Sequence, residues 1–460
     1  MSRYLWGACS LFLFAQPALA ASDADLDKIR AEVQQLKQTY EARIQALEAR
    51  LQKAESRVDA AQATAQQAQE QVTQVASAPP PAAAAPAGAN AFNPDISLIL
   101  SGTYANLSQD PNKYRLTGFI PSPESSPGTR SFSLGESELG VYANIDPYLH
   151  GGLNLALAPD NTLSVEEAFI QTLGLGHGLT IKAGRFFSAI GYLNEQHAHT
   201  WDFVDNPLAY KAFLGTQFSQ DGVQLKWLAP TDTFLEVGAE IGGGGNFPGS
   251  ERNRNGIGSA ALFAHVGGDI GFSQSWRAGV SYLQTKPQSR SYEDSNLSGA
   301  TVTNAFSGNS HLWVADFVWK WAPNGNVTHT NFKLQGEYFR RREAGALTYD
   351  TTASTLSSAY AATQSGAYLQ GVYQFMPRWR VGLRRDQLDS GHVDYSLNNA
   401  YLARPDYAPS KNSVMLDYNP SEFSRFRLQL AQDKSRQGVT DNQIFLQYLM
   451  SLGAHGAHQF

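Results

Sequence analysis

The chain has 460 residues and a formal net charge of −6, which is small for this length. No dense stripe of Lys or Arg occurs, so nothing in the composition points to a nucleic-acid partner. The mean hydropathy is negative, but a membrane β-barrel also gives a negative value, because half of each spanning strand faces water.

The first twenty residues have the features of a secretory signal peptide. Arg3 supplies a positive charge, residues 5–14 are apolar, and Ala-Leu-Ala at 18–20 is a small-residue cleavage site. Beyond it, no run of about 18 apolar residues predicts a transmembrane helix. The single cysteine, Cys9, lies within this signal. A lipoprotein acylated there is the alternative, but apolar sequence continues past Cys9. The mature chain is therefore expected to have no disulfide and no thiolate metal site.

Residues 22–76 are predicted to form a periplasmic coiled coil. Apolar residues recur in steps of three and four from Leu26 to Val75, which is the pattern of an a/d seam. An isolated helix of this kind has no core to join, so we expect it to associate with copies of itself. A homotrimer fits a trimeric channel, and a single solvated helix is the alternative. The Pro- and Ala-rich residues 77–92 predict a semi-extended linker.

Residues 93–460 are predicted to form an outer-membrane β-barrel, because candidate strands of about ten residues recur with period-two patterning. The last strand is the clearest: Ile444, Leu446, Tyr448, Met450 and Leu452 occupy alternate positions, and Phe460 ends the chain in the same phase. Turns rich in Pro, Gly and Asn alternate with long segments, most of them polar, at 109–129, 191–220, 242–255, 286–310, 343–364 and 391–411.

This alternation matches the short periplasmic turns and long outer loops of outer-membrane barrels. The fold class expected is thus all-β, a transmembrane barrel of about sixteen antiparallel strands preceded by a helical coiled coil, with about 14 or 18 strands as alternatives. The location expected is the outer membrane of a Gram-negative cell, in contact with lipid. The facing of the strands at 165–172 and 180–189 is left open.

Charged residues opposite the apolar positions are predicted to line the pore, and their sign changes along the chain. The acidic residues belong to early strands and the basic residues to late strands, so a closed ring would place them opposite each other and set a field across the lumen. Local charge pairing in a wet lumen is the alternative. The residues are Glu136, Glu138, Glu236, Glu240, Arg380, Arg384, Arg425 and Arg427.

Two groups of histidines are weak candidates for a metal site. The segment 191–220 contains Glu195, His197, His199 and Asp202, and imidazole with carboxylate suits a borderline ion such as Zn²⁺. The alternative is a polar loop whose charges face solvent. His455 and His458 near the C-terminus form the second group, and the periplasmic rim of the last strand is its alternative. No catalytic motif occurs, so neither an enzyme nor a cofactor is expected.

Two stretches resemble known families. V-E-E-A-F-I-Q-T followed by L-T-I-K-A-G-R-F-F-S-A-I-G-Y, within 165–192, and D-G-V-Q-L-K-W at 221–227 resemble the phosphate-selective porin O/P superfamily. The ending F-L-Q-Y-L-M-S-L-G-A-H-G-A-H-Q-F is similar to a proteobacterial outer-membrane family often labelled zinc-regulated TonB-dependent receptors. The porin resemblance implies that the third outer loop, 191–220, folds inward and narrows the pore. The second resemblance implies a role in metal uptake.

The favoured function is a passive or facilitated channel for small hydrophilic or ionic solutes, with zinc or other metal ions as a specific possibility. One alternative is a TonB-dependent receptor, although about 370 barrel residues do not supply the roughly 22 strands of that class. Another is a structural tether, in which the helical arm contacts peptidoglycan and the barrel serves as anchor.

Overall fold

The computed structural model describes residue 34 and residues 94–453, apart from 121, 123, 124 and 252. The chain divides into two units, Met1–Gly88 and Ala89–Phe460, and the strands belong to the second. The signal peptide at 1–20, all but one residue of the coiled coil predicted at 22–76, and the linker predicted at 77–92 lie outside the described residues. So do His455 and His458.

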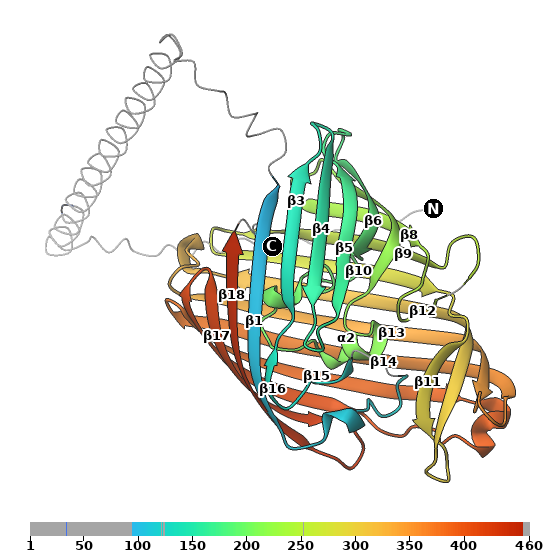
Figure 1. Cartoon of the computed structure of the whole chain (residues 1–460). Helices are drawn as coiled ribbons and strands as arrows, with labels where there is room; N and C mark the ends of the chain where they lie inside the picture. Colours follow the sequence, from blue (N-terminus) through green and yellow to red (C-terminus); the bar gives the residue numbers. More distant parts are fainter. Residues whose placement is uncertain (1–33, 35–93, 121, 123–124, 252, 454–460) are drawn as a thin grey trace, which may run out of the picture. The chain divides into compact units, whose positions relative to one another are not determined.

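Sixteen antiparallel strands form a closed barrel (Figure 1). Each strand pairs with the next along the ring, and the last strand, β18, pairs with the first, β1, over eleven residue pairs from Ser97↔Gly453 to Leu107↔Gln443. This confirms the predicted strand number. The sixteen strands are β1 Asp95–Leu107, β3 Ser137–Asn144, β4 Leu149–Leu157, β5 Leu163–Thr172, β6 Leu179–Phe187, β7 Ser219–Leu228, β8 Phe234–Gly242, β9 Ser259–Ile270, β10 Gln274–Thr285, β12 Thr301–Trp321, β13 Asn331–Tyr349, β14 Leu356–Met376, β15 Trp379–Asp394, β16 Ser410–Ser421, β17 Ser424–Lys434 and β18 Asp441–Gly453.

Two short strands extend this ring without adding to it. β2 (Ser131–Leu134) pairs with β1 beyond the point where β3 pairs with it, so β2 and β3 together make one interrupted wall strand. β11 (Arg290–Ser295) pairs with the outer part of β12. Short helices lie in the connections: η1 Pro111–Lys113, η3 Ala198–Thr200, α2 Leu208–Phe213, η4 Pro323–Gly325 and η5 Ser396–Ala400.

Side chains alternate between the two faces of the wall, as the sequence pattern predicts. In β18, Ile444, Leu446 and Tyr448 are exposed, whereas Gln443 and Phe445, on the alternate positions, are buried. Exposed apolar side chains recur in this way on strand after strand. A belt this extensive on a single protein marks a surface that is covered in its native setting, and lipid is the covering that suits a barrel. No helix within the described part of the chain is long and apolar enough to cross a membrane.

Two segments expected to be polar loops are strands instead. Much of 286–310 belongs to β11 and β12, and most of 343–364 belongs to β13 and β14. Apolar side chains on the inner face explain the difference, because they pack into a cluster with the facing loops and extend the sheet beyond the level of the other strands. The cluster contains Ile120, Tyr292, Val302, Phe306, Leu347, Tyr349, Tyr360, Ala362, Val393, Tyr395 and Leu402.

A β-bulge in β5 explains why the sequence does not settle which face the side chains at 165–172 occupy. Asn154 of β4 pairs with Glu167, but Leu155 pairs with Val165, so Glu166 is an extra residue in β5. An extra residue breaks the period-two alternation. As a result, Glu166 and Glu167 both reach the inner side of the barrel, where both contact His197.

The strand count also bears on the receptor label. TonB-dependent receptors are plugged barrels of about 22 strands, whereas this barrel closes with sixteen. The receptor mechanism that the resemblance of the C-terminal ending implies is therefore not supported by this fold.

The closure of the barrel can be tested with a pair of cysteines across the seam. Thr103 and Gln447 are partners in the β1–β18 register, and partners in an antiparallel pair have Cα atoms about 4.5–5.5 Å apart, within reach of a disulfide. We expect Thr103→Cys with Gln447→Cys to cross-link under oxidation, as seen by mass spectrometry of the linked peptides. Thr103→Cys with Gln432→Cys, on β17, should remain unlinked; a bond in this control and none across the seam would contradict the closure.

Candidate functional site

The connection between β6 and β7 folds into the barrel. We call residues 188–218 the inward loop. Its ends are joined by a hydrogen bond from the Ser188 N–H to the Phe218 carbonyl, and its side chains include some of the most deeply buried in the described protein: Leu208, Tyr210 and Phe213 are fully buried. The inward folding implied by the porin resemblance is therefore present (Figure 1).

The helix α2, within the inward loop, packs against the inner face of β13, β14 and β15. All six of its residues, L-A-Y-K-A-F, are buried. A helix that is apolar around most of its circumference needs partners on all sides, and the wall supplies them through Phe339 and Leu388. The first outer loop covers another side, where Phe119 meets Phe213 edge to face at 5.6 Å. This apolar packing fixes the centre of the inward loop.

A buried carboxylate anchors the same part of the inward loop. Glu337 of β13 accepts hydrogen bonds from the backbone N–H groups of Tyr192 and Leu193, each at 3.1 Å, and from the hydroxyls of Tyr210 and Tyr368. A carboxylate that accepts this many donors holds two distant parts of the loop on one strand. Glu337 is not among the residues predicted from the sequence. The available signal is its phase, because it alternates with Leu334 and Tyr338 in a period-two strand.

Asp202 of the inward loop binds the basic side of the wall. It pairs with Lys333 of β13 and with Arg380 of β15, the latter at 3.1 Å, and it accepts a hydrogen bond from Gln370 of β14 at 3.2 Å. Three neighbouring strands thus contact one carboxylate. The sequence suggests Asp202 as a metal ligand beside His197 and His199. In the structure its carboxylate is instead the counter-ion of Lys333 and Arg380.

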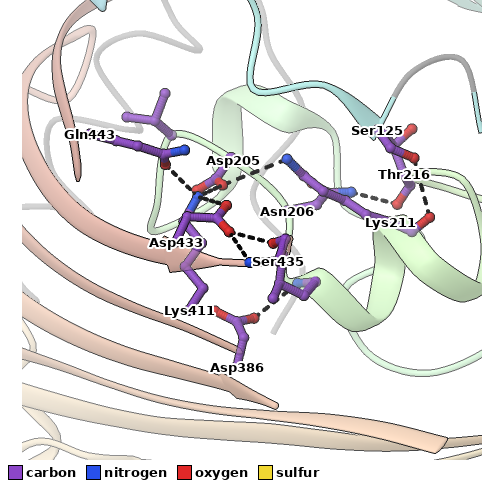
Figure 2. A network of polar contacts seen from close by, with 12 residues as sticks. Ser125, Asp205, Asn206, Lys211, Thr216, Asp386, Lys411, Asp433, Ser435 and Gln443 are labelled. Atoms are coloured by element: carbon purple, nitrogen blue, oxygen red, sulfur yellow. Dashed lines mark hydrogen bonds and ion pairs between the residues drawn. The ribbon is translucent and has the colours of Figure 1, made fainter. Parts of the chain in front are cut away.

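Asp205, three residues after Asp202, also pairs with basic side chains of the wall (Figure 2). Its carboxylate lies 2.9 Å from the Arg384 guanidinium and 2.7 Å from the Lys411 ammonium group. Lys411 also donates to Gln443 of β18 at 2.8 Å, so the network reaches from β15 to the closing strand. The Lys211 ammonium of α2 lies 3.8 Å from Asp205. The chain places its anionic groups where the wall is cationic.

These cations keep both aspartates ionised. Burial acts to raise the pKa of Asp202, but the charges of Lys333 and Arg380 outweigh it and lower the pKa below its ordinary value. For Asp205 the balance is the same, with Lys411 as the leading cation. Burial also lowers the pKa of Lys211 to about 8, against the opposing attraction of Asp205.

On the opposite side, two histidines of the inward loop contact a carboxylate wall formed by β3 and β5. His197 Nε2 lies 3.0 Å from Glu167, and its Nδ1 lies 3.3 Å from Glu166. His199 Nδ1 lies 3.0 Å from Glu138, which is also 3.4 Å from His197 Nδ1. Burial alone would lower the pKa of His197, but the hydrogen bonds to Glu166 and Glu167 raise it well above its ordinary value.

The structure brings only some of the sequence candidates together. His197 and His199 stack with their ring centroids 5.8 Å apart, but Glu195 instead forms an ion pair with Lys226 of β7 at 2.8 Å. The partners of the histidines are Glu138, expected to line the pore, and Glu166 with Glu167, which the sequence analysis left unassigned because the bulge hides their facing.

The remaining residues expected to line the pore lie as follows. Glu236 bonds His265 at 3.0 Å, and Glu240 accepts from the Ala189 N–H of the inward loop at 2.9 Å. Arg427 pairs with Asp417 at 2.7 Å, and Arg425 donates to the backbone carbonyl of His199 at 2.5 Å. These charges are engaged locally, and many of their partners belong to the inward loop.

Glu136 lies apart from the other seven. It occupies the two-residue break between β2 and β3, where it is exposed, whereas Glu138 is 3% exposed. The interruption of the strand, which the sequence pattern does not reveal, separates two residues expected to share one face.

Comparison with known proteins places this barrel among relatives. No family model matches the sequence. An uncharacterized protein of Aquifex aeolicus (strain VF5) is 31% identical over 399 residues, which cover 80% of this chain and 80% of that protein. The chain belongs to the same family as this protein.

Solved structures show the fold of this family. A loop L8 deletion mutant of OmpT, an outer membrane protein of Vibrio cholerae, has a TM-score of 0.50 and 12% identity, with 78% of this chain and 99% of that chain covered. The outer membrane channel DcaP of Acinetobacter baumannii has a TM-score of 0.48 and 13% identity, with 78% and 97% covered. The likeness to the OmpT mutant shows that this chain has the fold of an outer-membrane β-barrel.

Removing the charge of Asp205 should loosen the inward loop. Asp205→Asn leaves Arg384 and Lys411 without their shared carboxylate, and unpairing buried charges costs about 3 kcal/mol. We expect faster amide hydrogen exchange across residues 202–214, measured by mass spectrometry on the barrel in detergent. Asp232→Asn, in the exposed turn between β7 and β8, is the matched control. Unchanged protection in Asp205→Asn would show that apolar packing alone holds the loop.

Acid should release the basic side of the loop only at low pH. Because Asp202 and Asp205 have pKa values below their ordinary 3.8 in the folded protein, their ion pairs stabilise the docked loop above about pH 4. That stabilisation is lost as pH falls through the lowered pKa values. We expect amide exchange protection of residues 202–206, corrected for the intrinsic pH dependence, to persist at pH 5. At pH values under about 3.8 this protection should decrease. Loss of protection already at pH 5 would contradict this assignment.

Proposed function

We propose that this protein is a passive channel for small hydrophilic or ionic solutes, narrowed by the inward loop. The observation that carries the proposal is the loop itself, which crosses the interior of a sixteen-stranded porin-like barrel and is bonded to opposite walls. Such a loop reduces the open cross-section while leaving the wall intact, as a selective constriction requires.

The distribution of charge supports a preference among solutes. Carboxylates of β3, β5 and β8 lie on one side and arginines of β15 and β17 on the other. Most of these groups are buried, so their effect on a solute acts through the field that they set across the inward loop. A low-dielectric wall strengthens such a field. We infer that dipolar and ionic solutes are oriented at the inward loop, and that neutral solutes of the same size pass less selectively.

Arg425 has the position best suited to act on a passing ion. Its guanidinium donates to the backbone carbonyls of His199 and Trp201, which are neutral groups, and it is only partly buried. Arg380, Arg384 and Arg427 by contrast each bond a carboxylate. The positive charge of Arg425 therefore contributes most directly to ion selectivity in this proposal.

Metal ions or small metal complexes remain a proposed class of cargo, supported by the two loop histidines beside three glutamates. We further propose that the channel is a homotrimer held through the predicted coiled coil at 22–76, with this arm in the periplasm and within reach of peptidoglycan. The a/d pattern of that segment supports self-association. A barrel that serves only to anchor a tether is the second candidate, and it would carry no current.

Single-channel recording in a planar bilayer tests the proposal. The purified full-length protein should give discrete openings, and openings in groups of three would support the trimer. Arg425→Gln removes a positive charge from the constriction. The reversal potential in a salt gradient should therefore shift in the direction of greater cation selectivity. Arg378→Gln, which removes the same charge from the exposed turn between β14 and β15, should leave the reversal potential unchanged. A silent barrel would refute the channel and favour the tether.

A further inference from the structure

Four polar atoms converge where the inward loop meets β3, β4 and β5. His197 Nδ1 lies 3.4 Å from Glu138 Oε2 and 3.3 Å from Glu166 Oε2. The amide nitrogen of Asn154 lies 3.0 Å from the same Nδ1, and 3.1 Å and 3.3 Å from the same two carboxylate oxygens. The ligand atoms of Glu138, Glu166 and His197 all lie within 4.8 Å of one another.

These separations fit the corners of a metal-ion coordination tetrahedron. Zn²⁺ binds nitrogen and oxygen ligands at about 2.0–2.2 Å, and a tetrahedron of that size has edges of about 3.3–3.6 Å. The His197 to Glu138 and His197 to Glu166 separations of 3.4 and 3.3 Å match those edges, whereas a direct charge-assisted hydrogen bond is usually about 2.7–2.9 Å long. These two edges thus already have the length of a metal-binding tetrahedron, and the Glu138 and Glu166 oxygens lie within 4.8 Å of each other.

The Asn154 side chain supplies an independent indication. It is 3% exposed, its amide group points into the cluster, and its Oδ1 atom has no hydrogen-bond partner although it is buried. A half-turn of the amide exchanges Oδ1 with Nδ2. The unsatisfied oxygen then faces His197 Nδ1 and the two carboxylates, where it becomes a fourth ligand. A bound cation then gains a neutral oxygen ligand, in exchange for the three contacts that the Asn154 amide nitrogen makes in the metal-free site.

The surrounding contacts are those that orient metal ligands. Glu167 Oε2 lies 3.0 Å from His197 Nε2, so it accepts the Nε2 hydrogen while the metal ion displaces the proton from Nδ1. His199 Nδ1 lies 3.0 Å from Glu138 Oε1, which holds the other oxygen of Glu138 towards the centre. A carboxylate behind a ligating histidine, and a donor behind a ligating carboxylate, are the usual supports of such sites.

The charges also favour a divalent cation. Three carboxylates, Glu138, Glu166 and Glu167, share the space around two imidazoles, and mutual repulsion of like charges in a buried site is costly. The ammonium group whose charge acts on Glu167 is that of Lys182 on β6, which lies over the Phe169 ring at 4.5 Å. Imidazole nitrogen combined with oxygen ligands suits a borderline ion such as Zn²⁺.

We propose that Glu138, Asn154, Glu166 and His197 bind one divalent transition-metal ion, such as Zn²⁺, which fastens the inward loop to the wall. Three ligands come from three adjacent wall strands and the fourth from the inward loop. The ion is therefore a cross-link between the loop and one wall of the barrel. This ion stays bound and acts as an effector, in addition to any metal ions that the channel carries as cargo. The binding stands on these contacts alone, while the effect of the metal on current rests on the proposed channel function.

Metal binding is tested on the full-length protein in detergent, after metal is stripped with a chelator, in a His455→Ala, His458→Ala background that removes the C-terminal histidines. Titration of Zn²⁺ in competition with a chromophoric chelator should give one equivalent per chain. His197→Ala and Glu166→Gln should each weaken binding at least about tenfold. Asn154→Asp, which keeps an oxygen at the fourth corner, should retain it, and His329→Ala, an exposed control, should have no effect.

No saturable binding, or equal affinity in His197→Ala with heat-modifiable gel mobility intact, would overturn the site. Bilayer recording then tests the latch: Zn²⁺ should change the conductance of the background protein and leave that of His197→Ala unchanged. Binding without any change of conductance in an active channel would overturn the latch. An absence of channel openings in every variant would refute the proposed function instead, and the titration would still decide the site.

Discussion

Everything in this structure depends on the pairing of the first strand with the last. Inside a bilayer no water is present to bond a free backbone amide or carbonyl, so a sheet that spans it has to close on itself. The eleven residue pairs between β1 and β18 provide that closure. Once the ring is complete, alternate side chains face lipid and the others face an enclosed interior. Polar residues far apart in the sequence can then contact one another inside the barrel.

The interior is organised by charge matching between one loop and its surroundings. The inward loop carries histidines where the wall is acidic and aspartates where it is basic. Buried ion pairs of this sort contribute little net stability compared with apolar packing, but misplacing a partner is expensive. These charged residues thus give the loop one orientation, while α2 supplies most of the cohesion through Tyr210 and Phe213. Orientation and cohesion come from different residues.

Much of the barrel can be predicted from the sequence because lipid imposes a strict period of two. Every wall strand expected from that pattern is present, including the closing strand. The pattern fails where its period is broken: the bulge at Glu166 and the interruption before Ser137 change the facing of carboxylates without any local signal. The partners of His197 come from β3, β4 and β5, and only the register of the closed sheet brings those strands to one loop. Residues such as Glu337 and Lys411 could be placed on the inner face, but their contacts depend on where the loop lies.

The strands of this barrel differ greatly in length, and the short ones set its relation to the membrane. β4, β6 and β8 have nine residues each, and nine residues tilted by about 45° rise only about 21 Å. β12 and β14 have 21 residues each and must extend well outside a layer of that height. The hydrocarbon thickness of the bilayer therefore has to match the height of the short strands, as in the thin outer membrane of bacteria. A thicker bilayer would accommodate the barrel poorly.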